Sequence, residues 1–191
     1  MIKFKKIKWK NFLSTGDHWT EIDFLEKNTN LIIGHNGSGK STLLDALTFV
    51  LFNKPFRKIN KTQLINTVNE KDCLVELEFD VNAREYVVRR GMKPTVFDIE
   101  VNGSPLHRQA DDRSNQKILE ENILKVNYKS FTQIVILGSS TFVPFMQLSS
   151  SVRRDVIEDL LDIRIFSFMN NLLKDKSVSY THLTLPTSPH V

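Results

Sequence analysis

The chain has 191 residues, of which 40% are apolar and 25% charged, as is usual for a globular domain with a hydrophobic core. Its longest apolar stretches, near residues 43–52 and 134–137, are shorter than the roughly 18–20 residues of a membrane span, so we expect no membrane segment. A formal net charge of +4 permits an anionic partner without identifying one, and the single cysteine, Cys73, excludes an internal disulfide.

The N-terminal residues predict a β-hairpin. Residues 2–9 mix lysines with apolar, β-rich residue types and predict an edge-like strand, and residues 20–24 predict its hairpin partner. Strand alternation divides the lysines between two faces, with Lys3 and Lys5 on one side and Lys6, Lys8 and Lys10 on the other. We therefore interpret them as a solvated edge rather than a stripe that contacts DNA.

The next segment predicts a buried strand followed by a buried helix. Residues 31–33 form a short, fully apolar strand pattern, which suits a sheet covered on both faces. Residues 40–52 predict a helix that is apolar nearly all round, with Asp45 as its lone internal charge. Four cations follow it and are interpreted as a solvated loop, with DNA contact as the alternative: Lys54, Arg57, Lys58 and Lys61.

The middle of the chain predicts an antiparallel β-subdomain beside this core. Its strands are expected at residues 74–79, 85–90 and 96–101. The remaining patterns predict a helix at 114–124, a buried strand at 134–137, an amphipathic helix at 152–161 and the first turns of another helix at 165–176.

The last residues, 179–191, differ from the rest of the chain. They contain two prolines and no Asp, Glu, Lys or Arg, and they break the preceding helical pattern abruptly. We interpret them as a non-native tail, with a genuine disordered tail as the alternative, and exclude them from the fold. On the first interpretation the natural protein continues beyond residue 178.

The motif that carries chemistry is Gly34–Ser41, GHNGSGKS, which matches the P-loop pattern G-x4-G-K-[ST]. Glycines let successive backbone N–H groups turn toward phosphates, and the start of a helix adds its positive dipole end. Lys40 is the candidate catalytic residue and is expected at the β- and γ-phosphates, with the Ser41 hydroxyl on Mg2+. The predicted nucleotide-binding residues are Gly34, Asn36, Gly37, Ser38, Gly39, Lys40, Ser41 and Thr42.

Three segments read together add a family resemblance. They are residues 10–24 (KNFLSTGDHWTEIDF), residues 30–57, which contain the P-loop and NKPFR, and residues 128–166, which contain QIVILG and PFMQLSSSVRRDVIEDLL. The pattern resembles the N-terminal ATPase half of the SMC-like DNA double-strand-break repair ATPases of SbcC type. It is most similar to the large-subunit type of the T-even bacteriophage recombination endonucleases, over residues 1 to about 176.

The resemblance implies a fold and a set of partners. The fold would be an α/β P-loop NTPase, the N-terminal half of an ABC-type ATPase head at residues 1–164, with a coiled-coil helix starting at 165–178. The cofactors would be ATP and Mg2+, and two heads would sandwich ATP as a homodimer. The whole protein would be an ATP hydrolase that controls a partner nuclease on double-stranded DNA ends, in the cytoplasm, or in the host cytoplasm if it is phage-encoded.

Several family elements have no match in the chain. No apolar run ends in Asp-Glu, as a Walker B strand would, and Leu148–Ser151 lacks the glycines of a signature motif. Ser139 stands where the family places its Mg-contacting glutamine, and Leu13 stands where it places an early arginine. Gln133 is the alternative Mg ligand, although a polar residue at the start of a strand is the favoured interpretation.

Two other functions stay open. One is an SMC-like structural ATPase that organises DNA without a nuclease partner. The other is a small P-loop kinase, which the predicted hairpin ahead of the P-loop disfavours. Because P-loops occur in many unrelated enzymes, the motif by itself predicts a nucleotide and not a reaction.

Overall fold

The computed structural model describes residues 2–27, 29–106, 112–136, 143–161, 163, 165–166, 169–170, 172–174 and 176. Within the chain, contacts define two compact units, Met1–Phe142 and Val143–Val191. The predictions for Ser139 and for the tail at 179–191 lie outside the described residues. The domain boundaries at 164 and 178 stay predictions.

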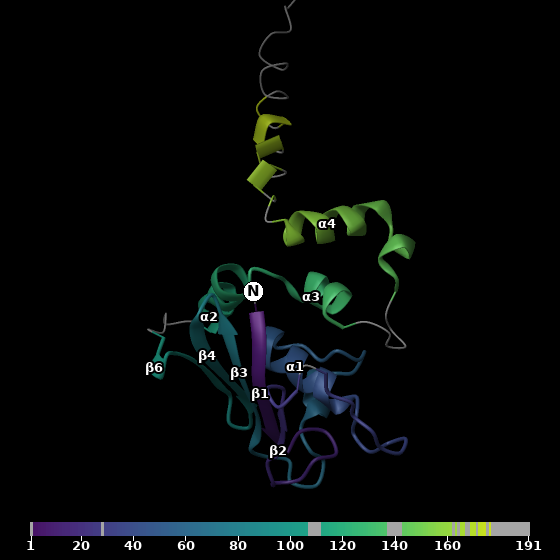
Figure 1. Ribbon diagram of the computed structural model, residues 1–191, viewed down its shortest axis with the longest axis vertical. Coiled ribbons are helices and arrows are strands. Elements are labelled where there is room, and N and C mark those ends of the chain that lie inside the picture. The colour runs from purple at the N-terminus through teal and green to yellow at the C-terminus, as the bar shows by residue number, and fades with distance from the viewer. Residues whose placement is uncertain are drawn as a thin grey trace, which may run out of the picture. The chain divides into compact units, whose positions relative to one another are not determined.

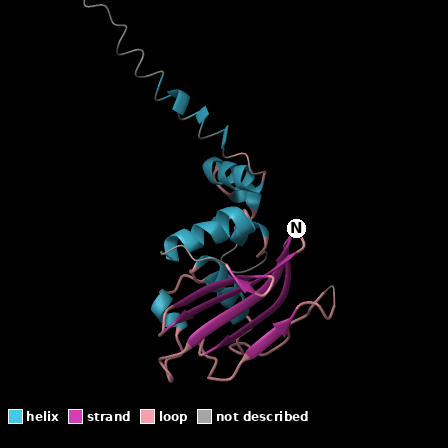
Figure 2. Ribbon diagram, turned by 90° about the vertical axis from the view of Figure 1, so that its left-hand side faces the viewer, coloured by secondary structure: helices cyan, strands magenta, loops and turns pink. Residues whose placement is uncertain are grey.

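Unit 1 is built on an antiparallel six-stranded sheet of order β2-β1-β3-β4-β5-β6 (Figure 1). Figure 2 shows these strands side by side as one layer. The strands predicted in the middle of the chain are confirmed, and they continue the same sheet as the N-terminal hairpin. The strands are β1 Ile2–Lys10, β2 Thr20–Asp23, β3 Cys73–Val81, β4 Arg84–Met92, β5 Val96–Val101 and β6 Ser104–Pro105.

The prediction that the first strand is an edge strand is wrong, because β1 pairs with β2 on one side and β3 on the other. The predicted division of its lysines is also wrong. A β-bulge between Phe4 and Lys6 shifts the register, so that Phe4 and Ile7 both belong to the hydrophobic core. The bulge thereby places the lysines before and after it on the same, polar face of the sheet.

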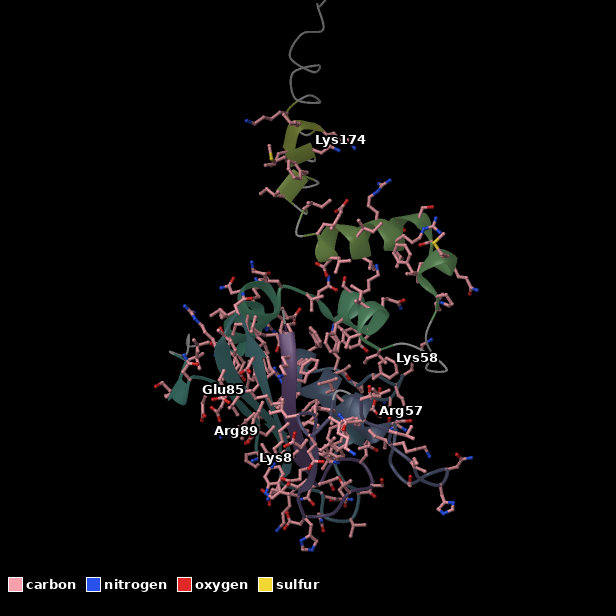
Figure 3. All side chains as sticks on the ribbon, in the orientation of Figure 1. Lys8, Arg57, Lys58, Glu85, Arg89 and Lys174 are labelled. Carbon is pink, nitrogen blue, oxygen red and sulfur yellow. The ribbon has the colours of Figure 1, made fainter. Side chains whose placement is uncertain are left out.

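On that polar face the lysines of β1 are neutralised by carboxylates. The Nζ atom of Lys8 lies 2.7 Å from Glu76 Oε1, and Glu76 also accepts a hydrogen bond from Arg89. The other pairs are Lys5 with Asp80 and Glu85, Lys6 with Glu21, and Lys10 with Asp17. Lys8, Glu85 and Arg89 lie along the strands in Figure 3. The lysines therefore stabilise the sheet locally instead of presenting an unpaired positive stripe.

The opposite face of the sheet packs against helix α1, Thr42–Phe52. The helix is buried along almost its whole length, as predicted, and Phe49, Val50 and Leu51 are each 0% exposed. A chain of ring contacts links strand and helix residues to the segment around residue 131: Phe79 with Phe4, Phe4 with Phe131, and Phe131 with Phe52. Cys73 is buried in the same core, and burial raises the pKa of its thiol to about 12.

Three further helices complete the described part of unit 1 after residue 106. Helix α2, Asp112–Lys117, continues into the π-helix η2, Ile118–Leu124, so the predicted helix is confirmed. The predicted strand at 134–137 is wrong for its described residues, because helix α3 spans Tyr128–Ile134 and residues 135 and 136 form a turn and a bend, while residue 137 lies outside the described residues. The Asn127 side chain accepts a hydrogen bond from the Ser130 N–H, which caps that helix and explains its start.

Unit 2 contains the short 3-10 helix η3, Phe145–Gln147, and helix α4, Ser150–Leu160, which confirms the predicted amphipathic helix. Val156 is 3% exposed, whereas Leu160 and Leu161 are 61% and 59% exposed. The described residues after 164 are helical. The predicted apolar face of α4 is therefore only partly buried.

We expect Glu76→Gln to lower the free energy of unfolding by about 1–3 kcal/mol at neutral pH, since it breaks two charge-assisted hydrogen bonds at a side chain that is 8% exposed. Burial by itself would raise the pKa of Glu76, but the hydrogen bonds from Lys8 and Arg89 hold it below 4.5. A carboxyl group whose pKa is lowered by folding stabilises the fold when the pH is above its unfolded-state pKa. That stabilisation is lost as the pH falls through its folded-state pKa.

The difference between wild type and Glu76→Gln in urea unfolding should therefore shrink as the pH is lowered from about 6 to about 3. Glu26→Gln, at an exposed position, is the matched control and should show a small difference at every pH. A difference for Glu76→Gln that stays constant across this range would contradict the role of the ion pairs.

Candidate functional site

The segment that leads into the P-loop does not form the predicted strand. Residues 31–33 have no strand partner among the described residues, and Leu31 and Ile33 are 82% and 83% exposed. Trp9, Ile32 and Ile33 line a cavity of about 260 Å³, and the buried indole N–H of Trp9 has no hydrogen-bond partner among the described residues. An apolar segment forms a strand only where a neighbouring strand pairs with its backbone, and none of the described strands pairs with residues 31–33.

The P-loop itself is closed and curled. Gly37 and Gly39 have φ values of +86° and +92°, which favour glycine because a side chain is strained there. The Ser38 N–H donates to the His35 carbonyl at 3.2 Å, and the Thr42 N–H donates to the Gly39 carbonyl at 2.9 Å. The loop runs directly into the buried helix α1, so the backbone at the helix start has the geometry that binds anions.

Lys40 lies over this loop. Its Nζ donates to the carbonyl oxygens of Gly34 and His35, both at 2.7 Å. Among the described residues, the amino group thus donates only to neutral acceptors. A phosphate oxygen is a stronger acceptor for an ammonium group than a carbonyl, so this arrangement suits exchange of carbonyl contacts for phosphate contacts.

Ser41 and Thr42 differ in how far their side chains are available to a ligand. Ser41 occupies the N-cap position of α1 but makes no side-chain capping hydrogen bond, which leaves its hydroxyl available as a metal ligand. Thr42 is 3% exposed, so any contact it makes with a ligand is limited to a small surface. The residues present therefore fit a Mg2+ ion that is held mainly by phosphates and one hydroxyl.

A cavity of about 560 Å³ lies at the P-loop, within the size range of small-molecule sites. Of the predicted nucleotide-binding residues it gathers six, whereas Ser38 lines the neighbouring 260 Å³ cavity and Gly34 lines neither. The six are Asn36, Gly37, Gly39, Lys40, Ser41 and Thr42. The rest of the lining comes from the connection between β1 and β2, from the 3-10 helix η1, Lys61–Leu64, and from the segments on either side of η1, with residues Leu13, Ser14, Arg57, Gln63, Ile65 and Thr67.

Arg57 is a cavity residue that the sequence analysis placed in a solvated loop. Its Nε and Nη2 atoms lie 2.6 Å from Asp45 Oδ2, and the backbone N–H groups of Phe56 and Arg57 donate to Asp45 Oδ1. Asp45 is fully buried, whereas the Arg57 side chain is 44% exposed. The sequence held one indication of this pair, the single charge of Asp45 inside an apolar helix, because a buried carboxylate requires a partner.

Gln133 is not at a strand start, since it lies in helix α3. Its Oε1 atom is buried and has no hydrogen-bond partner among the described residues. It does not line the P-loop cavity, so the structure does not bring it together with Ser41. The assignment of Gln133 as a Mg2+ ligand has no support from this geometry.

Among the described residues, no group of three or more His, Cys, Asp or Glu side chains is arranged to hold a metal ion. No helix in the described part of the chain has the length and apolar character needed to cross a membrane.

Comparison with known proteins identifies relatives over nearly the whole chain. The family model described as an AAA domain matches residues 6–179. The chain is 43% identical over 172 residues to exonuclease subunit 2 of Enterobacteria phage T4, covering 90% of this chain and 30% of that protein. Exonuclease subunit 2 of Escherichia phage RB69 is 40% identical over 174 residues, with 91% of this chain and 31% of that protein covered.

A more distant relative also matches over most of this chain. The DNA double-strand break repair Rad50 ATPase of Thermoplasma volcanium is 30% identical over 165 residues, covering 83% of this chain and 18% of that protein. The chain thus spans less than a third of each of these relatives. This ratio means that these proteins contain large regions with no counterpart in the present sequence.

Solved structures show the same fold. A structure from a study of ATP-driven dimerization and DNA-stimulated activation of SMC ATPases matches with a TM-score of 0.55 and 25% identity, covering 83% of this chain and 99% of that one. The Smc head domain with a coiled coil and joint from Pyrococcus yayanosii matches with a TM-score of 0.51 and 20% identity, covering 96% of this chain and 37% of that one. The α/β fold of an ATPase head is therefore confirmed.

We expect Asp45→Asn to destabilise the chain by about 1–3 kcal/mol, because the amide cannot accept all the hydrogen bonds that the buried carboxylate takes from residues 56 and 57. Urea denaturation followed by circular dichroism measures the change. Glu26→Gln removes one exposed negative charge and serves as the control. Equal stabilities for the two variants would show that the Asp45–Arg57 contact contributes nothing.

Proposed function

We propose, from the premise that this chain belongs to the AAA domain family, that it is the ATP-binding N-terminal half of an SMC-like ATPase head. In the whole protein this head would regulate a partner nuclease during DNA double-strand-break repair or recombination. The observation that carries the nucleotide assignment is the curled P-loop at the start of a buried helix, with Lys40 above it and a cavity of about 560 Å³ beside it.

The ligand we propose is Mg-ATP. The N–H groups at the start of α1 and the Lys40 ammonium would hold the triphosphate, and the free Ser41 hydroxyl would hold Mg2+. When bound, Mg2+ supplies neutralisation of the charge that develops on the transferred phosphoryl group. Lys40 contributes to the same stabilisation through charge-assisted hydrogen bonds, so this chain's own share of the chemistry is positioning and electrostatics.

The exposed segment before the P-loop supports a head completed by a second half. Leu31 and Ile33 are each more than four-fifths exposed, yet they precede a P-loop, which normally follows a strand inside a sheet. A strand from the other half of the head would pair with residues 31–33 and cover them. The relatives are three to five times longer than this chain, which leaves room for such a half.

The nuclease partner is proposed from the relatives. Two of them are named exonuclease subunit 2, at 43% and 40% identity, and a third is named as a double-strand break repair ATPase. These names favour nuclease regulation over a purely structural DNA-organising ATPase, the second candidate, which the likeness to SMC heads keeps open. A homodimer of heads joined through ATP and activity on double-stranded DNA ends belong to the same proposal.

We expect Lys40→Ala to abolish Mg-ATP binding or to weaken it at least about tenfold, because it removes the only lysine that contacts the P-loop among the described residues. Isothermal titration calorimetry measures the affinity. Lys58→Ala, at an exposed lysine that does not line the cavity, is the matched control. Unchanged affinity in Lys40→Ala would remove the basis of the site assignment.

We expect the 191-residue chain alone to hydrolyse ATP at a negligible rate, because its sequence has no Walker B carboxylates to orient the attacking water. A phosphate-release assay at saturating Mg-ATP tests this, with Lys40→Ala as the baseline. Robust turnover that disappears in Lys40→Ala would refute the proposal that the catalytic carboxylate lies in another segment.

A further inference from the structure

A second cavity, of about 380 Å³, lies at the opposite end of helix α1 from the P-loop. Asn53, the C-cap residue of α1, lines it together with residues from β4, β5 and α2. Since α1 has 11 residues, the two cavities lie at ends of a helix about 16 Å long. This second site is therefore separate from the proposed nucleotide site.

The lining of this cavity is strongly cationic. Four of its side chains are basic and a single one is acidic, namely Lys61, Arg90, Arg113 and Lys117 against Asp112. Of these cations, Lys61 and Arg90 form no ion pair with the described residues, whereas the lysines of β1 at positions 5, 6, 8 and 10 each lie within 3.4 Å of a carboxylate oxygen. The excess of positive charge is thus local to the cavity.

Arg90 is the deepest of these cations. The residue is 5% exposed, and its guanidinium lies 3.7 Å from the centre of the Phe97 ring. Its hydrogen-bond acceptors are neutral: the Val50 carbonyl at 3.0 Å and Gln116 Oε1 at 2.6 Å. Burial lowers the pKa of Arg90 to about 9, against the opposing effect of the nearby Asp112 and Glu120 carboxylates, and Arg90 stays charged at neutral pH. No carboxylate among the described residues forms an ion pair with it.

Lys61 adds a second cation to the same wall. Burial, together with the charge of Arg90, lowers its pKa. Its Nζ lies 5.9 Å from the centre of the Phe49 ring, and the described residues offer it no ion pair. Two cations that disfavour each other in the lining of one cavity are both stabilised by an anion bound between them.

From this charge distribution we infer that the cavity is a binding site for a small phosphorylated ligand, held by Lys61, Arg90 and Lys117. Guanidinium and ammonium groups together favour phosphate, which offers more charge and more acceptor oxygens than a carboxylate. The volume of about 380 Å³ suits a small molecule, and the apolar residues Val96 and Phe97 provide contact for its organic part. A buried guanidinium such as Arg90 is poorly placed for a wide DNA duplex.

The test is a ¹H–¹⁵N NMR titration of the 191-residue chain with inorganic phosphate as the probe. The amides of Gly91 and Thr95 report on this cavity, and those of Gly37 and Gly39 report on the P-loop. We expect saturable shifts at Gly91 and Thr95. Because the two sites are observed separately, failure at one leaves the other assignment standing.

Two double variants of equal charge change make the test specific. Lys61→Gln with Lys117→Gln should weaken phosphate binding at Gly91 and Thr95 at least about tenfold. Lys27→Gln with Lys71→Gln, at exposed lysines outside the cavity, should change it less than about twofold. Each variant's circular dichroism spectrum should match that of the wild type, since all four positions are exposed.

Three results would overturn the proposal. One is the absence of shifts at Gly91 and Thr95, and another is equal weakening in both double variants, which would indicate a general charge effect. The third comes from a parallel titration with a short DNA duplex. If the duplex shifts these amides and inorganic phosphate does not, the surface binds a polynucleotide and the small-ligand site is wrong.

Discussion

The structure depends on the burial of helix α1, whose N-terminus carries the P-loop. A helix start can bind phosphate only if its N–H groups are held in place, and here the helix is held by Phe49, Val50 and Leu51, all fully buried against the sheet. Asp45 of α1 also holds the loop after the helix in place, since it accepts hydrogen bonds from residues 56 and 57. The packing of the sheet core against α1 therefore also fixes the position of the P-loop and its cavity.

Charges serve two purposes in this molecule. On the outer face of the sheet, lysines and carboxylates alternate across neighbouring strands and neutralise one another. Such pairs stabilise the strand register but offer little to an anionic ligand. At the two ends of α1, by contrast, Lys40 and Arg90 donate hydrogen bonds only to neutral oxygen atoms among the described residues. The distribution of unpaired charge, rather than the net charge of +4, is the basis on which we propose the two anion sites.

Apolar residues show a similar contrast. The residues that face α1 are fully buried, whereas Leu31 and Ile33 before the P-loop lie exposed. A strand needs backbone partners as well as apolar side chains, and none of the described strands pairs with residues 31–33. The exposed segment is thus the place where this chain lacks a neighbour, which agrees with the large regions of its relatives that have no counterpart here.

The sequence by itself determined the P-loop, the buried helix after it and most strands, because glycine spacing and apolar periodicity are local properties. It did not reveal the β-bulge at Lys5, which reverses the sides of β1, because a bulge depends on pairing with β3. Nor did it reveal helix α3, where the cap at Asn127 and the contacts of Phe131 outweigh a β-rich composition. Only the tertiary structure brought Arg57 to Asp45 and Arg90 to Lys61, since these contacts join residues from different elements.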